Sequence, residues 1–154
     1  MATTTTDRIE KEIVLRAPRS RVWRALTDSK EFGAWFQIRF TEPFRLGARV
    51  LGQITYPGKE HLSGEFVIEA MEPERRFAYR WHPNAGDPAE DYSKEPMTLV
   101  EFTLGDVEGG TRLRLVESGF DAIPISRRAE AFRRNDGGWT ALMAAIEAYV
   151  SRNP

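Results

Sequence analysis

Residues 126–152 read SRRAEAFRRNDGGWTALMAAIEAYVSR. Large apolar residues recur in this stretch at steps of three, four and seven, which is the spacing of one face of an α-helix. The residues on this face are Phe132, Trp139, Leu142, Met143, Ile146, Tyr149 and Val150. The opposite face, expected to point toward water, carries Arg127, Arg128, Arg133, Arg134, Glu147 and Arg152. The stretch therefore predicts one long amphipathic helix that the rest of the chain must cover.

Two features qualify the start and the middle of this helix. Ser126 is a candidate N-cap, because its hydroxyl can accept a bond from a free backbone N–H of the first turn. Gly137 and Gly138 interrupt the pattern, and each costs a helix about 1 kcal/mol relative to alanine. Because the apolar spacing continues across the pair, the prediction is one helix, weakened or kinked at the glycines. The pair is also a candidate place for the close approach of a ligand or another backbone.

The chain before this helix is predicted to be mostly β-strands. Alternating apolar residues predict a first strand over residues 8–16. Pro18, and then Asp28 with Glu31 as a capping box, predict the starts of two short helices. Further strands are predicted over residues 37–41, 48–56, 61–71, 75–81, 98–104 and 111–118. Short turns join most of them, so we expect an α+β fold with an antiparallel sheet of about seven strands against the C-terminal helix.

Length and composition indicate a single domain over residues 1–154, with residues 1–7 as a flexible tail. The chain is 41% hydrophobic and 29% charged, as is usual for a globular protein. It contains no cysteine, so it has neither a disulfide framework nor a thiolate nucleophile. That composition fits the reducing cytoplasm, where we expect the protein to reside.

Charge and hydropathy argue against two classes of partner. The 22 basic and 23 acidic residues leave a net charge of −1, which gives no general attraction for nucleic acid. The N-terminal residues lack the apolar core of a signal peptide, and no apolar run approaches the roughly 20 residues of a membrane span. A homodimer is compatible with the sequence.

Several stretches together resemble a known family. They are IEKEIVLRAPRSRVWRALTD at 9–28, WHP at 81–83, EPMTLVEFTL at 95–104, GGTRLRLVESGF at 109–120 and GGWTALMAAIEAYV at 137–150. They resemble the START-like, or SRPBCC, helix-grip superfamily, and within it the family named for homology to the activator of heat-shock protein 90 ATPase. The resemblance covers about residues 8–152. It implies a curved sheet that grips the C-terminal helix, with an apolar cavity between them, and it implies no particular catalytic residue.

The candidate ligand-binding residues are those expected to face the interior. Any single aromatic among them is expected to be ordinary core, but a group of bulky rings facing a concave sheet is typical of an apolar pocket. The set comprises Trp35, Phe36, Trp81, Phe102, Glu117, Phe132, Trp139 and Met143.

Glu117 is the unusual member of this set. It shares a strand face with Leu113 and Leu115, so its carboxylate is predicted to point inward, where a charge needs partners. One interpretation is an ion pair with an arginine, for which Arg45, Arg49 and Arg80 are candidates, or exposure at the end of the strand. The others are a polar anchor for a ligand and an acid/base group.

No metal or cofactor site is expected. The two histidines, His61 and His82, have no partner at metal-ligand spacing, and His82 lies beside a long acidic loop, residues 83–96, that is either solvated or a lid. The leading hypothesis is a binding protein for a hydrophobic small molecule. The alternatives are an enzyme of the same fold that uses Glu117 or His82 as acid/base, and a regulator of a chaperone ATPase.

Overall fold

The structure is a computed structural model that describes residues 7–83 and 91–154. Residues 1–6 and 84–90, which hold most of the expected tail and half of the acidic loop, lie outside the described residues. The element order is one strand, two short helices, six strands and a long helix, with a 3-10 turn before the last helix. This order is the one predicted, and the α+β helix-grip fold is confirmed.

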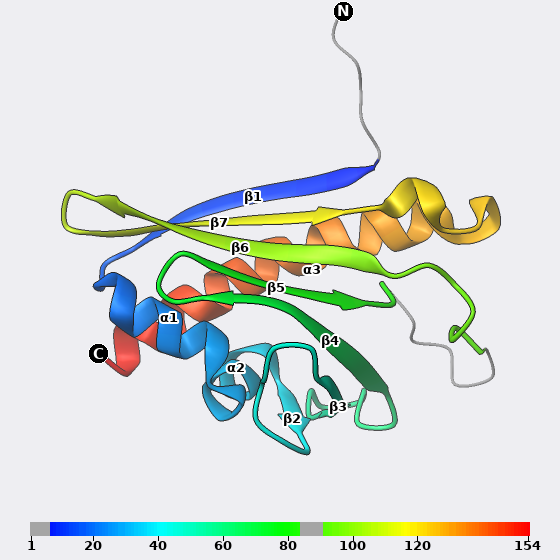
Figure 1. Ribbon diagram of the computed structural model, residues 1–154, viewed down its shortest axis with the longest axis horizontal. Coiled ribbons are helices and arrows are strands. Elements are labelled where there is room, and N and C mark those ends of the chain that lie inside the picture. The colour runs from blue at the N-terminus through cyan, green and yellow to red at the C-terminus, as the bar shows by residue number, and fades with distance from the viewer. Residues whose placement is uncertain (1–6, 84–90) are drawn as a thin grey trace, which may run out of the picture.

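Seven strands form one antiparallel sheet in the order β1-β7-β6-β5-β4-β3-β2 (Figure 1). Each strand from β2 to β6 pairs with the next strand along the chain, and β1 closes the sheet against β7. The strands are β1 Arg8–Leu15, β2 Ile38–Phe40, β3 Arg49–Ile54, β4 Ser63–Glu72, β5 Arg76–Trp81, β6 Thr98–Val107 and β7 Gly110–Ser118.

The hairpin between β6 and β7 is tighter than the sequence suggested. A turn was expected over residues 105–110, but pairing continues to Val107 opposite Gly110. The two-residue turn that remains uses Gly109 at a φ of 80°, a conformation that favours glycine. The extra pairing lengthens β6 to Val107, and β7 runs from Gly110 to the end of the strand where Glu117 lies.

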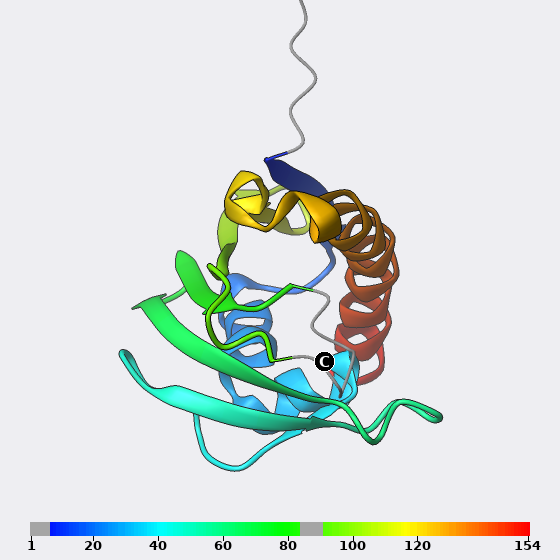
Figure 2. The same cartoon turned by 90° about the vertical axis from the view of Figure 1, so that its right-hand side faces the viewer.

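The three helices lie on the concave side of the sheet (Figure 2). Helix α1 (Arg19–Thr27) and helix α2 (Ser29–Phe36) close one end, and helix α3 (Ile125–Arg152) runs opposite the sheet. The prediction of one continuous C-terminal helix is confirmed. The N-cap prediction for Ser126 is wrong, because α3 begins one residue earlier and Pro124 caps it. The carbonyl of Pro124 accepts bonds from the N–H groups of Arg127 and Arg128, and its side chain makes no cap hydrogen bond.

The glycines of α3 do not mark a close approach. Gly137 and Gly138 are exposed, and a Cβ added to either would meet no atom within 4 Å. The expected close approach is instead at Gly33 of α2, where an added Cβ would collide with the carbonyl oxygen of Ile38. Gly33 therefore allows α2 to lie directly on β2, which brings the aromatic face of α2 into the core.

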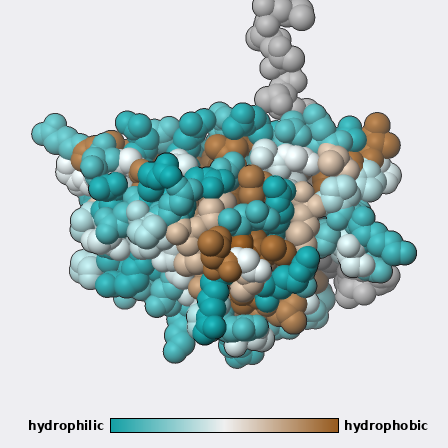
Figure 3. Space-filling view, viewed as in Figure 1, coloured by the Kyte–Doolittle hydropathy of each residue, from teal (hydrophilic) through white to brown (hydrophobic). Residues whose placement is uncertain are grey.

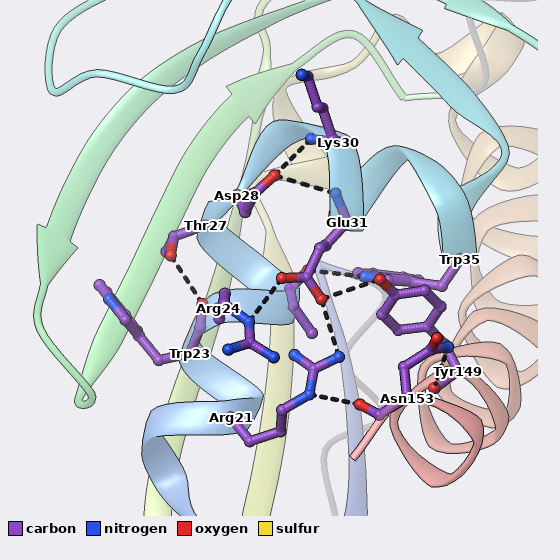
Figure 4. Close-up of polar contacts among 11 residues, drawn as sticks. Arg21, Trp23, Arg24, Thr27, Asp28, Lys30, Glu31, Trp35, Tyr149 and Asn153 are labelled. Carbon is purple, nitrogen blue, oxygen red and sulfur yellow. Dashed lines mark hydrogen bonds and ion pairs between the residues drawn. The ribbon is translucent and has the colours of Figure 1, made fainter.

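A partly buried polar network fixes the C-terminal end of α3 to the two short helices (Figure 4). Asp28 caps α2 through the N–H of Glu31, as predicted, but Glu31 does not complete a capping box. Its carboxylate instead pairs with Arg21 at 2.8 Å and accepts the Tyr149 hydroxyl at 2.9 Å. Arg21 also donates to the carbonyl of Asn153 at 2.7 Å, so α1, α2 and α3 share one set of contacts.

The outer face of the sheet is largely polar, with an apolar area over β3 and β4 (Figure 3). Leu51 of β3 is 55% exposed, and Leu46 in the preceding loop is also exposed. Among the described residues, no helix is long and apolar enough to cross a membrane.

We predict that Gly138→Ala raises the free energy of unfolding by about 1 kcal/mol, because alanine is the better helix former and its methyl group meets open space. Gly33→Ala is the matched comparison and should lower stability, since the same methyl group has no room there. Urea denaturation of both variants measures the difference. A loss of stability in Gly138→Ala would show that the added methyl group does not meet open space at this position.

Candidate functional site

The carboxylate of Glu117 lies inside the protein, as its position on the strand predicts. Glu117 is 0% exposed and lies on the same face of β7 as the buried Leu113 and Leu115. Its neighbours across the ladder are Ile9 of β1 and Val100 of β6, which are both buried and apolar. A charge in such surroundings needs strong hydrogen bonds or a counter-ion.

Four protein donors supply these hydrogen bonds. Oε2 accepts from the Trp81 indole N–H at 2.7 Å and from the Thr98 hydroxyl at 2.6 Å. Oε1 accepts from the Trp139 indole N–H at 2.8 Å, and the Asn135 amide donates to both oxygens, at 3.0 and 3.2 Å. We call these five residues the indole–carboxylate cluster. The donors come from β5, β6 and α3, so one carboxylate joins the sheet to the long helix.

The cluster contains no arginine. Of the candidate partners, Arg49 pairs with Glu65 and Arg80 pairs with Glu69, and no ion pair to Glu117 occurs within residues 7–83 and 91–154. Indole and amide N–H groups can only donate, so both oxygens of Glu117 must act as acceptors. The charge is therefore held by neutral donors, and the ion-pair interpretation is wrong for the described part of the chain.

Aromatic rings pack around the two indoles. The centroids of Trp81 and Trp139 are 5.7 Å apart with the planes inclined at 34°. Phe36 lies 5.9 Å from Trp81 and 6.3 Å from Trp139, and Phe102 lies 5.8 Å from Trp139. We call these four rings the ring cluster. Trp139 and Phe102 are fully enclosed, whereas Phe36 and Trp81 are half-buried, so only these two offer ring surface near the exterior.

The other predicted aromatic and methionine residues are not members of the ring cluster. Trp35 is buried and donates its indole N–H to the Ala25 carbonyl at 2.9 Å, so it serves the core between α1 and α2. Met143 is buried one helical turn after Trp139. Phe132 is half-buried and packs on Phe120 at 5.2 Å, outside the ring cluster.

Tyr79 is a feature that the sequence analysis did not select. It lies on β5 two residues before Trp81, its ring stacks on Phe66 at 4.5 Å, and it is fully buried. Its hydroxyl has no hydrogen-bond partner among the described residues. Burial raises the pKa of Tyr79 well above 10.0, and the nearby charge of Glu117 raises it further. The hydroxyl is therefore a protonated donor in the apolar interior.

The two histidines lie in different surroundings. His82 follows the end of β5 and is half-buried, and its Nδ1 has no partner in the described chain. Burial lowers the pKa of His82 below 6.5, so the ring is neutral at pH 7. His61 is exposed in the turn before β4. No group of three potential metal ligands occurs among the residues that the structure describes.

Comparisons with known proteins agree with this fold. A family model described as Activator of Hsp90 ATPase homolog 1-like protein matches residues 16–151. The comparison with curated proteins gave no match.

Solved structures extend the comparison. Protein MLL2253 from Mesorhizobium loti is 24% identical, with a TM-score of 0.75 over 96% of this chain and 98% of that one. The Aha1 dimer from Colwellia psychrerythraea is 16% identical, with a TM-score of 0.68 over 93% of this chain and 95% of that one. DynU16, a protein in the dynemicin biosynthetic locus, is 21% identical, with a TM-score of 0.71 over 94% of this chain, which spans 47% of DynU16. At these identities the likeness shows a shared fold.

We predict that Glu117→Gln lowers the free energy of unfolding by about 1–3 kcal/mol, because the new amide leaves at least one buried donor without an acceptor. Glu12→Gln, which alters an exposed ion pair with Arg112 on the same sheet, is the matched control and should change stability by less than about 0.5 kcal/mol. Equal stabilities of the two variants in urea denaturation would contradict the role of Glu117 as the common acceptor.

The buried hydroxyl of Tyr79 predicts a pH dependence. The pKa of Tyr79 is higher in the folded than in the unfolded protein, so its stabilising effect is present below pH 10 and is lost as pH rises above it. Above pH 10 the ionisation of Tyr79 should cost the natural protein about 1.4 kcal/mol of unfolding free energy per pH unit. Tyr79→Phe should be spared this cost, and at pH 8 it should be no less stable than the natural protein. Denaturation of both proteins at pH 8 and pH 11 measures this, and parallel losses would refute it.

Proposed function

The chain belongs to the family of Activator of Hsp90 ATPase homolog 1-like proteins, and on that premise we propose that it binds a small apolar or aromatic molecule between the sheet and α3. Membership confirms the resemblance read from the sequence. The observation that carries the proposal is the orientation of two tryptophans by one buried carboxylate, next to the half-buried rings of Phe36 and Trp81.

The proposal rests on preorganisation. A mobile tryptophan side chain loses conformational entropy when it binds a ligand. Trp81 and Trp139 are already fixed by their hydrogen bonds to Glu117, so that cost is met before a ligand binds. Ring-to-ring contacts contribute about 0.5–1.5 kcal/mol beyond the area that they bury. A flat apolar ligand that reaches Phe36 and Trp81 would gain these contacts at little further cost in entropy.

Within this proposal Glu117 is a positioning residue. Its oxygens already accept from four protein groups, so a ligand that contacted the carboxylate would have to displace one of them. The same contacts count against an acid/base role, because a proton exchange with a ligand would require one of these protein contacts to be broken. The ligand is thus proposed to contact the rings that the carboxylate holds, with Trp35, Phe102 and Met143 as support behind them.

The place of DynU16 in the dynemicin biosynthetic locus fits a ligand-binding use of this fold. That argument is one of analogy, since a fold hosts many activities. The contacts of the ring cluster in this chain remain the main support for the proposal.

A neutral aromatic probe tests the proposal. We predict that 2-naphthamide shifts the indole N–H resonance of Trp81 in ¹H–¹⁵N spectra and raises the melting temperature. At one hundred times the dissociation constant the gain in stability is about 2.7 kcal/mol. Phe36→Leu should weaken binding. Phe40→Leu should not, because Phe40 is also half-buried but its ring packs on Phe32, Phe44 and Phe66, outside the ring cluster.

Two results would overturn the proposal. One is that the Trp81 resonance does not shift even when 2-naphthamide is added up to its solubility limit. The other is an equal loss of binding in Phe36→Leu and Phe40→Leu, which would place the ligand elsewhere.

A further inference from the structure

The inward face of α3 extends beyond the residues that the sheet covers. Ile125, Arg128 and Phe132 follow one another at steps of three and four, on the helical face that continues seven residues later to Trp139. Trp139 is 1% exposed, but Ile125 in the first turn of α3 is 83% exposed. The first two turns of the helix therefore leave an apolar strip open.

A groove of about 220 Å³ lies along this strip. Four described residues line it, namely Ile125, Arg128, Ala129 and Phe132, and we call it the α3 groove. Three of the four are apolar, so the guanidinium of Arg128 is the one charged group among these lining residues. Arg128 was expected on the water-facing side of the helix, but it is half-buried and lines the groove beside Phe132.

Backbone carbonyls hold this guanidinium in place without neutralising it. Nη2 of Arg128 donates to the carbonyl of Asp121 at 2.7 Å, and Nε donates to the carbonyl of Ile123 at 3.2 Å. No ion pair of Arg128 occurs within the described residues, whereas neighbouring Arg127 pairs with Glu95 and Arg134 pairs with Glu130. Of the five N–H bonds of a guanidinium, three remain available, on Nη1 and Nη2.

We infer that the α3 groove binds a small amphipathic organic acid, whose carboxylate pairs with Arg128 and whose apolar body packs on Phe132 and Ile125. A fixed guanidinium suits a carboxylate, because its planar donors match the two oxygens and little side-chain entropy is lost on binding. The volume is below the roughly 300–1,000 Å³ of sites for drug-sized ligands, so the acid is of the size of one or two rings or a short chain.

This groove is separate from the ring cluster. Phe132 precedes Trp139 by seven residues, or about 10 Å along the helix axis, so an acid of this size does not bridge the two. The backbone N–H groups of Arg127 and Arg128 already bond the Pro124 carbonyl, so the anion contact is the side chain of Arg128. The inference therefore does not depend on the function proposed above.

A matched pair of probes tests the inference. 2-Naphthoate and 2-naphthamide share one ring system and differ in charge. Titration followed by the backbone amide shifts of residues 125–132 measures the affinity of each probe for the α3 groove at constant ionic strength, apart from any binding at the ring cluster. We predict at least tenfold tighter binding of the naphthoate to this groove in the natural protein. Arg128→Gln should abolish the preference. Arg133→Gln, the same charge change on an exposed residue of the same helix, should keep it within twofold.

A second variant guards against misfolding of the first. Arg128→Lys keeps the charge but loses the planar donors, so it should retain part of the preference for naphthoate. Equal affinities of the two probes for the natural protein would overturn the inference, and so would equal losses in Arg128→Gln and Arg133→Gln. In either case an unchanged response of the Trp81 indole to 2-naphthamide would leave the ring-cluster proposal standing.

Discussion

A single buried carboxylate constrains this structure more than any other group. Moving an ionised carboxylate into an apolar interior costs several kcal/mol unless its oxygens are satisfied. Glu117 meets that requirement with neutral donors from β5, β6 and α3. Each such bond to a charged group contributes about 1.5–3 kcal/mol, but only if all the donors are in place together. The position of α3 over the sheet and the orientation of both indoles therefore depend on one another.

The long helix is fixed by polar contacts along its length as well as by its apolar face. Glu117 holds the middle of the helix through Asn135 and Trp139, where Lys11 of β1 also pairs with Asp136 at 2.9 Å. Arg127 of the first turn pairs with Glu95 at 2.7 Å, and the network around Glu31 holds the last turn. Contacts at three places explain why a pair of exposed glycines in mid-helix is tolerated. The α3 groove lies beside the first turns of this helix, where Ile125 is 83% exposed.

Periodicity predicted the elements well, because a two-residue or 3.6-residue repeat reports directly which side chains are buried. It also placed Glu117 correctly, since alternation from Leu115 leaves no other face. It did not identify Thr98 and Asn135 as donors, because their partner lies in another element and nothing local marks that contact. The same limit applies to Glu31, whose capping-box spacing was overridden by Arg21 and by Tyr149 more than a hundred residues away.

Hydrogen exchange of the indole N–H groups tests the role of Glu117 most directly, since the four tryptophans report separately. The account predicts slow exchange for Trp81 and Trp139, which donate to Glu117, and fast exchange for Trp23, whose indole N–H makes no hydrogen bond to the described residues. In Glu117→Gln, exchange at Trp81 or Trp139 should accelerate while Trp35, bonded to Ala25, stays protected. Exchange at Trp81 and Trp139 as fast as at Trp23 in the natural protein would contradict the account.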